Sequence, residues 1–368
     1  MFRKEVESVA RICEVSDIRW ERFPAVSRDP MAKKWLECQV LLGLAKNTVE
    51  AYARGVQEFM EFCEREAICA PLAKRDEVAR YVGYLRRRPG PKGRKVLAFD
   101  SGAGLSISTM QQRLTALRLF FDHLLEEGVR DSNPVGRGRY TPGKKFGGPH
   151  ERRLLPRLKR LPWIPSDEQW VAFLSEAQRE GIRNRCMIGL AYDAALRREE
   201  ICLIASQDID PAHRTIRIRA ETTKGGGERV VPYSEATGAL MREYLRHRRT
   251  LSPERGQLFL SESRRNRAVP ITFWTWSKVI RRIADSTQLE QFSTHTLRHL
   301  RLTDLARAGW DLHEIARFAG HRSLETTQRY IHLSSRDLAQ RLGRGMDEIH
   351  QWRLRVLAEA CAGLEKPE

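Results

Sequence analysis

The sequence lacks long apolar runs and a cysteine framework. No stretch reaches the roughly 18 apolar residues that a membrane-spanning helix needs, and residues 1–20 hold no apolar run of signal-peptide length. The seven cysteines are odd in number and contain no CxxC pair. This pattern argues against a disulfide framework or a zinc site and indicates reduced thiols. We therefore expect a cytoplasmic protein.

Acidic residues are scarce relative to basic ones. Lys and Arg number 65 against 47 Asp and Glu, so the formal net charge is +18 and the isoelectric point is about 10.0. The excess is concentrated in residues 80–95 and 136–160. A positive excess of this size favours a polyanionic partner, above all nucleic acid. The alternative interpretation is that the charge only keeps the protein soluble and that the two basic segments are solvated loops.

The length of 368 residues exceeds one ordinary core and predicts two domains. We expect an N-terminal extension over 1–30, a helical domain over 31–135, a basic Gly/Pro-rich linker over 136–160, a second domain over 161–345 and a tail over 346–368. The predicted fold class is mainly α with a small β-sheet in the second domain.

Local signals place the elements of both domains. Asn47–Thr48 is expected to cap one helix, a second is expected to start near Ser108–Thr109, and Asn133–Pro134 ends the run after it. In the second domain, 166–169 has capping-box spacing, a helix is expected near 181–204, and strands are expected at 215–219 and 229–231. The rest reads as helical to about residue 362, with breaks near 253, 270 and 320.

Several common chemistries are not supported. No GxxxxGK[ST] motif occurs, and the KGGGER segment lacks the strand–loop–helix context of a phosphate-binding loop. His295 and His299 are four residues apart, but no third metal ligand is nearby. Acidic residues do not converge as a two-metal nuclease requires. We expect neither a metal nor a cofactor.

What remains is a dispersed set of basic residues with one tyrosine. Each member alone has an ordinary interpretation, such as a surface ion pair, a solvated turn, a helix cap or a core tyrosine. Their joint order over more than 130 residues favours an active site. The candidate catalytic residues are Arg197, Lys224, His295, Arg298, His321 and Tyr330.

These positions resemble the tyrosine recombinases, also called phage integrases. Arg197 stands where that family has the arginine of its G-L-R-x-x-E-L box, and Lys224 where it has a hairpin lysine. The segment HTLRH, the Gly-His pair at 320–321 and Tyr330 follow in the family's order. The resemblance is strong over about 160–335. Residues 33–135 more weakly resemble the helical core-binding domain of such enzymes.

The sequence also departs from the family's pattern. Ala194 and Ala195 stand where Thr-Gly is usual, and alanine leaves the turn less permissive than glycine does. Leu300 stands where Thr is common, and the lysine turn has an unusual third glycine. None of these changes removes a charge or a proton donor, so we interpret them as variation in packing and in the lysine loop.

The resemblance implies a phosphoryl transfer that needs neither metal nor ATP. Two arginines would bind the non-bridging oxygens as planar forks. A tyrosine hydroxyl with a pKa of about 10 needs a proton acceptor, for which His295 is the candidate. His321 would hydrogen-bond the phosphate, and Lys224 would protonate the leaving 5′ oxygen. The product would be a 3′-phosphotyrosyl link, and Glu200 is assigned a supporting role beside these residues.

Candidate DNA contacts lie outside the catalytic set, with plain helix surface as the alternative. The tail from 331 to 368 balances six acidic against six basic residues, so it should pack on protein: on its own domain or, as the resemblance implies, on a neighbouring protomer. The candidate DNA-contacting residues are Thr48, Tyr52, Thr109, Arg113, Arg118, Lys144 and Lys145.

Three functions remain open from the sequence. The leading one is a site-specific recombinase or integrase, Xer-like or encoded by a transposon, acting as a homotetramer on two double-stranded DNA sites, with or without a partner recombinase. The second is a type IB topoisomerase, which would relax one duplex as a monomer. The third is a catalytically silent DNA-binding regulator of the same fold. The basic linker and the insertion at 86–106 favour a mobile-element enzyme.

Overall fold

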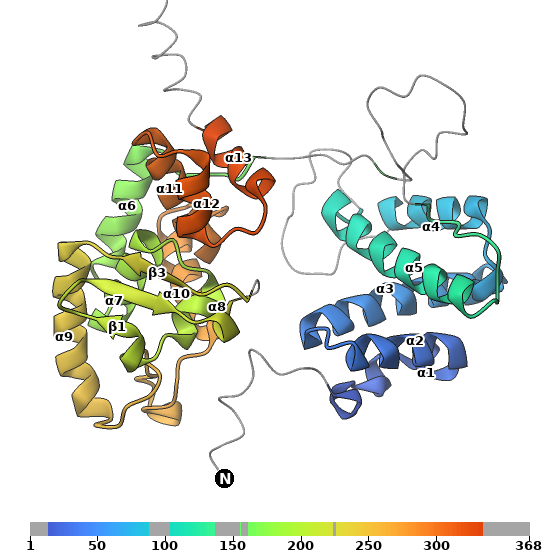
Figure 1. The fold of residues 1–368 in the computed structure, drawn as a ribbon, viewed down its shortest axis with the longest axis horizontal. Helices are drawn as coiled ribbons and strands as arrows, with labels where there is room; N and C mark the ends of the chain where they lie inside the picture. Colours follow the sequence, from blue (N-terminus) through green and yellow to red (C-terminus); the bar gives the residue numbers. More distant parts are fainter. Residues whose placement is uncertain (1–13, 88–103, 137–154, 156–160, 224–225, 334–368) are drawn as a thin grey trace, which may run out of the picture. The chain divides into compact units, whose positions relative to one another are not determined.

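The computed structural model describes residues 14–87, 104–136, 155, 161–223 and 226–333. The chain divides into two compact units, Met1–Lys159 and Arg160–Glu368, and each is described here by itself (Figure 1). Both are mainly helical, and the second contains a small sheet, which confirms the predicted fold class. The described residues do not include Lys144, Lys145, Lys224, most of the linker or the tail.

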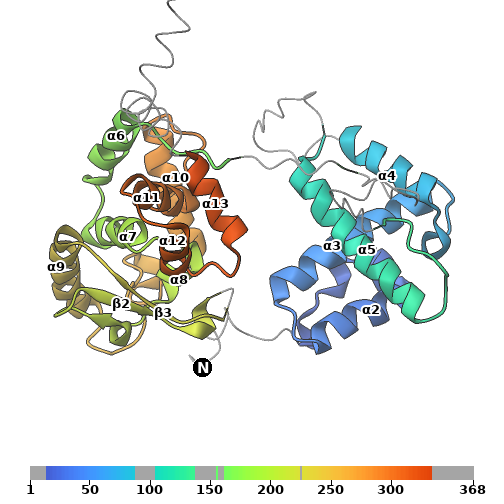
Figure 2. The same cartoon turned by 45° about the horizontal axis from the view of Figure 1, so that its top comes forward.

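Unit 1 is a helical domain around an aromatic core. Its longest helices, α3 and α5, pack against each other (Figure 2). A Cβ atom added at Gly55 of α3 would lie 2.8 Å from Ala116 Cβ of α5, so the small residue permits their close approach. Its helices are α1 (Pro24–Arg28), α2 (Pro30–Leu41), α3 (Lys46–Arg65), α4 (Arg75–Arg87) and α5 (Ile107–Glu126), with 3-10 turns at Val15–Asp17, Trp20–Arg22 and Ala70–Leu72.

Three sequence predictions for unit 1 need correction. Helix α3 is capped by Ala45, so Asn47 lies inside its first turn. Helix α5 is capped by Ser106, whose Oγ accepts from the Thr109 backbone N–H at 3.2 Å, two residues before the predicted start. Phe23 and Val26, assigned to the extension, are buried in the domain core. Short helices such as α1 leave too few turns for a periodic signal.

Unit 2 is a helical domain with a three-stranded antiparallel sheet in the order β1-β2-β3. Ile216 of β2 pairs with Val231 of β3, and both are buried against the helices. The described elements are α6 (Asp167–Ala177), α7 (Ile182–Asp193), α8 (Arg198–Leu203), β1 (Ile209–Asp210), β2 (Thr215–Ile218), β3 (Arg229–Pro232), α9 (Glu235–Leu251), α10 (Phe273–Ser286), α11 (Thr294–Arg307), α12 (Leu312–Ala319) and α13 (Leu324–Leu333), with 3-10 turns at Ser206–Asp208, Ala220–Thr222 and Arg264–Asn266.

The capping box at Ser166 is confirmed, but the helix predicted over 181–204 is two helices. Ala195 separates them with a left-handed φ of 46°. The backbone N–H of Ala195 bonds to Tyr192 O, and that of Leu196 bonds to Ala191 O, the two bonds of a Schellman motif. Alanine rarely takes this conformation, so the sequence offered no stop signal. The two-residue strand β1 was also missed, because it is too short to show alternation.

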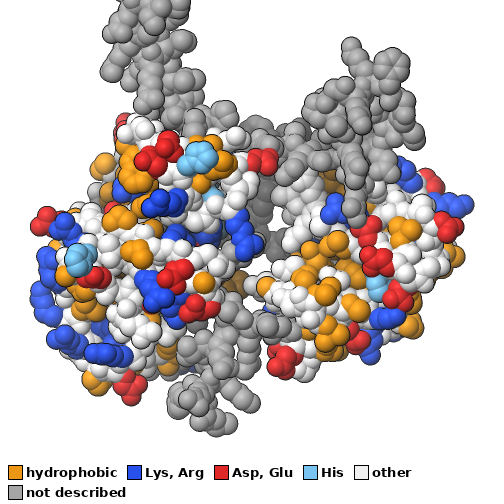
Figure 3. Space-filling model, in the orientation of Figure 1, with side chains coloured by type: hydrophobic (Ala, Val, Ile, Leu, Met, Phe, Trp, Pro, Cys, Tyr) orange, Lys and Arg blue, Asp and Glu red, His pale blue; other side chains and the backbone are white. Residues whose placement is uncertain are grey.

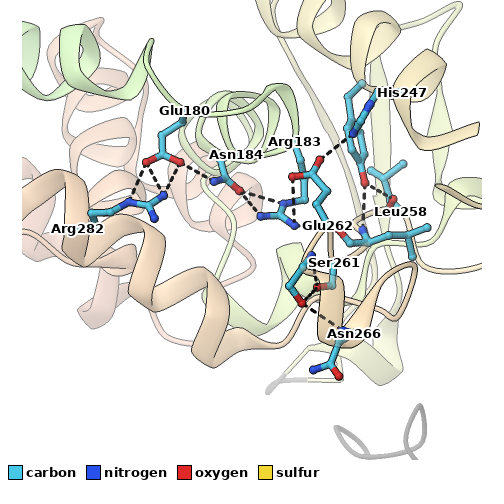
Figure 4. Close-up of polar contacts among 12 residues, drawn as sticks. Glu180, Arg183, Asn184, His247, Leu258, Ser261, Glu262, Asn266 and Arg282 are labelled. Atoms are coloured by element: carbon cyan, nitrogen blue, oxygen red, sulfur yellow. Dashed lines mark hydrogen bonds and ion pairs between the residues drawn. The ribbon is translucent and has the colours of Figure 1, made fainter. Parts of the chain in front are cut away.

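A polar network ties the helices of unit 2 to the loop between α9 and α10 (Figure 4). Arg282 of α10 donates two hydrogen bonds to one oxygen of Glu180, at 3.1 and 2.6 Å. Buried Arg183 of α7 donates to the carbonyl of Leu260 at 3.0 Å and lies 3.7 Å from Glu262. These contacts link α10 to Glu180, which precedes α7, and α7 to the loop between α9 and α10.

The surface of unit 2 carries many basic side chains. Lys and Arg are spread over the face shown in Figure 3, and Arg242, Arg246 and Arg249 are exposed along α9. Within the parts of the chain that the structure describes, no helix is long and apolar enough to cross a membrane.

Candidate active site

Two of the predicted catalytic arginines donate hydrogen bonds to backbone carbonyls at the ends of other helices. Arg298, in the middle of α11, is 3% exposed and donates to the carbonyls of Ala195 at 2.6 Å and Ala319 at 2.5 Å. Arg197 is the N-cap of α8 and donates to the carbonyl of Gly320 at 3.2 Å. The turn between α7 and α8 and the end of α12 therefore hold both guanidinium groups.

Glu200 is the shared acceptor of this cluster. It is 1% exposed and accepts from Arg197 twice, from Nη1 at 2.6 Å and from the backbone N–H at 2.9 Å. Arg229, which is not among the predicted site residues, donates to both of its oxygens, at 3.2 and 2.7 Å. Burial alone would raise the pKa of Glu200, but the hydrogen bonds and charges of Arg229 and Arg197 hold that pKa at about 2.

Tyr330 is buried, with 2% exposure, on α13. Its hydroxyl lies 2.8 Å from Nδ1 of His299. The ring of His321 is parallel to the Tyr330 ring within 7°, with centroids 6.1 Å apart, and His321 Nδ1 lies 2.9 Å from Thr327 Oγ1. Two histidines therefore flank the tyrosine, one at its hydroxyl and one along its face.

Comparison with known proteins agrees with this geometry. The model of the phage integrase family matches residues 166–336. Tyrosine recombinase XerD of Caulobacter vibrioides is 28% identical over 80% of this chain and 88% of the relative, and tyrosine recombinase XerC of Pelobacter propionicus is 29% identical over 79% and 86%. The chain is a tyrosine recombinase. It is thus an enzyme of DNA strand breakage and rejoining.

Solved structures show the same fold. The Tn1549 transposon integrase, in complex with transposon right end DNA, aligns with a TM-score of 0.60 at 17% identity, covering 84% of this recombinase and 98% of that chain. XerH recombinase bound to its palindromic difH substrate aligns with a TM-score of 0.61 at 18% identity, covering 91% and 88%.

The histidine at the nucleophile differs from the one that the sequence predicts. His295 was the predicted proton acceptor, yet the Tyr330 hydroxyl contacts His299, one helical turn further along α11. His295 is exposed near the N-terminus of that helix, 6.1 Å from His299 between ring centroids. The sequence indicates for His299 only a place in a possible metal pair with His295. Its spacing from Tyr330 carries no sequence signal, because the contact depends on how α13 packs on α11.

The two histidines beside Tyr330 are kept uncharged at neutral pH. Burial, together with the charge of Arg298 and neighbouring groups, lowers the pKa of His299 to about 4 and that of His321 to about 3. Burial raises the pKa of Tyr330 above its ordinary value, and the charges of Arg298, Arg329 and Arg197 offset only part of that rise. At neutral pH the tyrosine therefore carries its proton, and a neutral imidazole with its hydrogen on Nε2 accepts a hydrogen bond at Nδ1.

Lys224 lies outside the described residues, between Thr223 and Gly226 of the hairpin. The part of the recombinase that the structure describes gathers Arg197, Arg298, His321 and Tyr330 into one cluster with Glu200, while His295 lies beside His299 at its edge. No group of three His, Cys, Asp or Glu side chains suited to a metal ion occurs among the described residues.

The DNA-contact candidates of unit 1 are held by contacts within the domain. Arg113 Nε lies 2.8 Å from buried Glu58. The Tyr52 ring stacks on Trp35, with centroids 6.1 Å apart. Thr109 Oγ1 lies 2.8 Å from the Oγ of its helix cap, and Thr48 and Arg118 are half-buried. Their role in binding DNA stays a prediction, as it does for Lys144 and Lys145, which the structure does not describe.

Proposed function

We propose that this recombinase cuts DNA by attack of the Tyr330 hydroxyl on a backbone phosphate, giving a 3′-phosphotyrosyl link and a free 5′ hydroxyl. The contact between the Tyr330 hydroxyl and His299 carries the proposal, because it places a proton acceptor at the nucleophile. Burial raises the pKa of Tyr330, and Arg298 and Arg197, whose charges partly offset that rise, supply the positive field. Rejoining reverses these steps with the 5′ hydroxyl of another strand as nucleophile.

The two arginines would bind the non-bridging oxygens of the phosphate. Charge gathers on these oxygens as phosphorus becomes five-coordinate, and guanidinium forks match their geometry. Arg197 keeps part of its side chain, 22%, exposed, so it can reach a bound phosphate. His321 would donate a further hydrogen bond, and Lys224 would protonate the leaving oxygen.

We further propose a homotetramer on two duplexes, with or without a partner recombinase. The tail, whose charge is balanced over 331–368, would pack on a neighbouring protomer. The basic linker and the insertion at 86–106 favour a mobile-element enzyme over a chromosomal one, acting in the cytoplasm on nucleoid DNA.

A covalent-adduct experiment tests the nucleophile. The full chain is incubated with nicked duplexes made from fragmented genomic DNA of its source, and DNA that stays bound through denaturation is sequenced. We expect adducts at a recurring sequence with the wild type and none with Tyr330→Phe, which removes only the hydroxyl. Adducts that persist in Tyr330→Phe would contradict the assignment.

Two further outcomes separate the alternatives. Adducts accompanied by relaxation of supercoiled plasmid that lacks paired sites would support a type IB topoisomerase. Tight binding to DNA with no adduct on any fragment would support a silent regulator and would overturn the catalytic proposal.

A further inference from the structure

Arg229 contributes a third guanidinium group to the catalytic cluster. It is the first residue of β3, five positions after Lys224, and its side chain is 7% exposed. Both of its terminal nitrogens donate to Glu200, one to each carboxylate oxygen, at 3.2 and 2.7 Å. This two-pronged pairing is the strongest geometry available to an arginine and a carboxylate.

The guanidinium of Arg229 also lies against the turn that carries His321. Gly320 ends α12 with a left-handed φ of 63°, and a Cβ atom at that position would lie 3.0 Å from Arg229 Nη1 and 3.3 Å from its Cδ. The carbonyl of the same glycine accepts from Arg197. One turn therefore contacts two arginines and leads directly into a predicted phosphate-binding histidine.

The contacts of Glu200 reveal a competition among the arginines. Arg197 Nη1 lies 2.6 Å from Oε1, and Arg298 Nη1 lies 4.0 Å from Oε2, the oxygen to which Arg229 makes its shorter bond. Without Arg229, the described partners left to the buried carboxylate would be the side chain and backbone N–H of Arg197 and the more distant Arg298. A buried charge that loses its partner is strongly unfavourable, so the carboxylate would draw these two groups toward itself.

We propose that Arg229 is a positioning residue that occupies Glu200 so that Arg197 and Arg298 keep their charge and donors for the DNA phosphate. With three guanidinium groups around one carboxylate, two positive charges remain for the substrate. The same contact anchors the base of the hairpin that carries Lys224. This inference rests on the proposed role of Arg197 and Arg298 as phosphate ligands.

A double-mutant cycle on Arg229 and Glu200 tests the proposal. Arg229→Met, Glu200→Gln and the double variant are compared with wild type for the rate of adduct formation, on the nicked duplexes recovered by adduct sequencing. We expect Arg229→Met to slow the reaction about tenfold to a hundredfold, less than the roughly 10²- to 10³-fold typical of a donor that touches the reacting charge. The double variant should be at least about fivefold faster than Arg229→Met, because it no longer contains the unpaired carboxylate.

A conservative variant and a matched control separate charge from structure. Arg229→Lys keeps the charge without the fork, so its rate should lie between those of wild type and Arg229→Met. Arg219→Met removes another partly buried arginine near the sheet, one paired with buried Asp208 at 3.1 Å, and should leave the rate within about threefold of wild type. A double variant no faster than Arg229→Met, or a lysine variant no faster than the methionine variant, would overturn the proposal.

Thermal unfolding with inorganic phosphate gives a second readout that needs no DNA site. Phosphate should raise the melting temperature of wild type, of the double variant and of the control Arg219→Met by more than that of Arg229→Met. Equal shifts in all four proteins would also contradict the charge argument. If the wild type forms no adduct while phosphate distinguishes the variants as expected, the proposed function fails and the anion site stands.

Discussion

At the scale of single residues, the acid–base assignment turns on two histidines of one helix. His299 Nδ1 contacts the Tyr330 hydroxyl, whereas His295 is exposed one turn away. We expect His299→Asn to slow adduct formation about a hundredfold, within the roughly 10²- to 10⁴-fold range of general base catalysis, because an amide accepts a hydrogen bond but not a proton. His295→Asn, on the same helix, is the matched variant.

The pH dependence distinguishes the two histidines further. The pKa of His299 is lowered to about 4, so its neutral form persists until the solution approaches that pH. Adduct formation by the wild type should therefore fall on the acid side as His299 gains its proton, and this fall should vanish in His299→Asn. Circular dichroism at each pH confirms that the fold persists. A larger loss in His295→Asn, with a wild-type pH profile for His299→Asn, would return the role to His295.

At the scale of elements, the break between α7 and α8 places the carbonyl that holds Arg298. Ala195 takes a left-handed φ of 46° there. This conformation costs an alanine about 1–2 kcal/mol, whereas glycine adopts it readily. We expect Ala195→Gly to relieve that strain, offsetting the loss of one buried methyl group, and to keep cleavage unchanged because Ala195 O still accepts from Arg298.

Ala194→Gly is the control for that change. Ala194 is equally buried but has an ordinary φ of −92°, so glycine there loses the methyl group and gains chain entropy without relieving strain. The free energy of unfolding of Ala195→Gly should exceed that of Ala194→Gly by about 1 kcal/mol or more in urea titrations. Equal values would show that the turn stores no strain.

The same elements explain what the sequence could and could not predict. The capping box at Ser166 was found because its two partners are three residues apart. Arg229 was missed because an arginine at the start of a strand is usually solvated, and only the tertiary placement of β3 against Glu200 shows otherwise. The order of charged residues predicted the site, while the pairing inside it depends on packing between elements distant in sequence.

At the scale of the whole molecule, the net charge of +18 is the property that most affects DNA binding. Each phosphate contact releases condensed counterions, so the logarithm of the binding constant falls with the logarithm of salt by about 0.9 per contact. Unit 1 holds Arg113 in an ion pair with Glu58, which removes one candidate from the available charges. The basic segment at 136–160 is therefore the stronger candidate for phosphate contacts, and Lys144 and Lys145 lie within it.

The salt dependence of binding to a duplex of random sequence tests this view. We expect Lys144→Gln/Lys145→Gln to reduce the slope by about two, as predicted for the loss of two phosphate contacts, while the covalent reaction keeps its dependence on Tyr330. Arg353→Gln/Arg355→Gln removes the same charge from the balanced tail and should leave the slope unchanged, because we predict that the tail contacts protein. Equal reductions in both double variants would mean that net charge alone, and not its placement in the linker, sets the affinity for DNA.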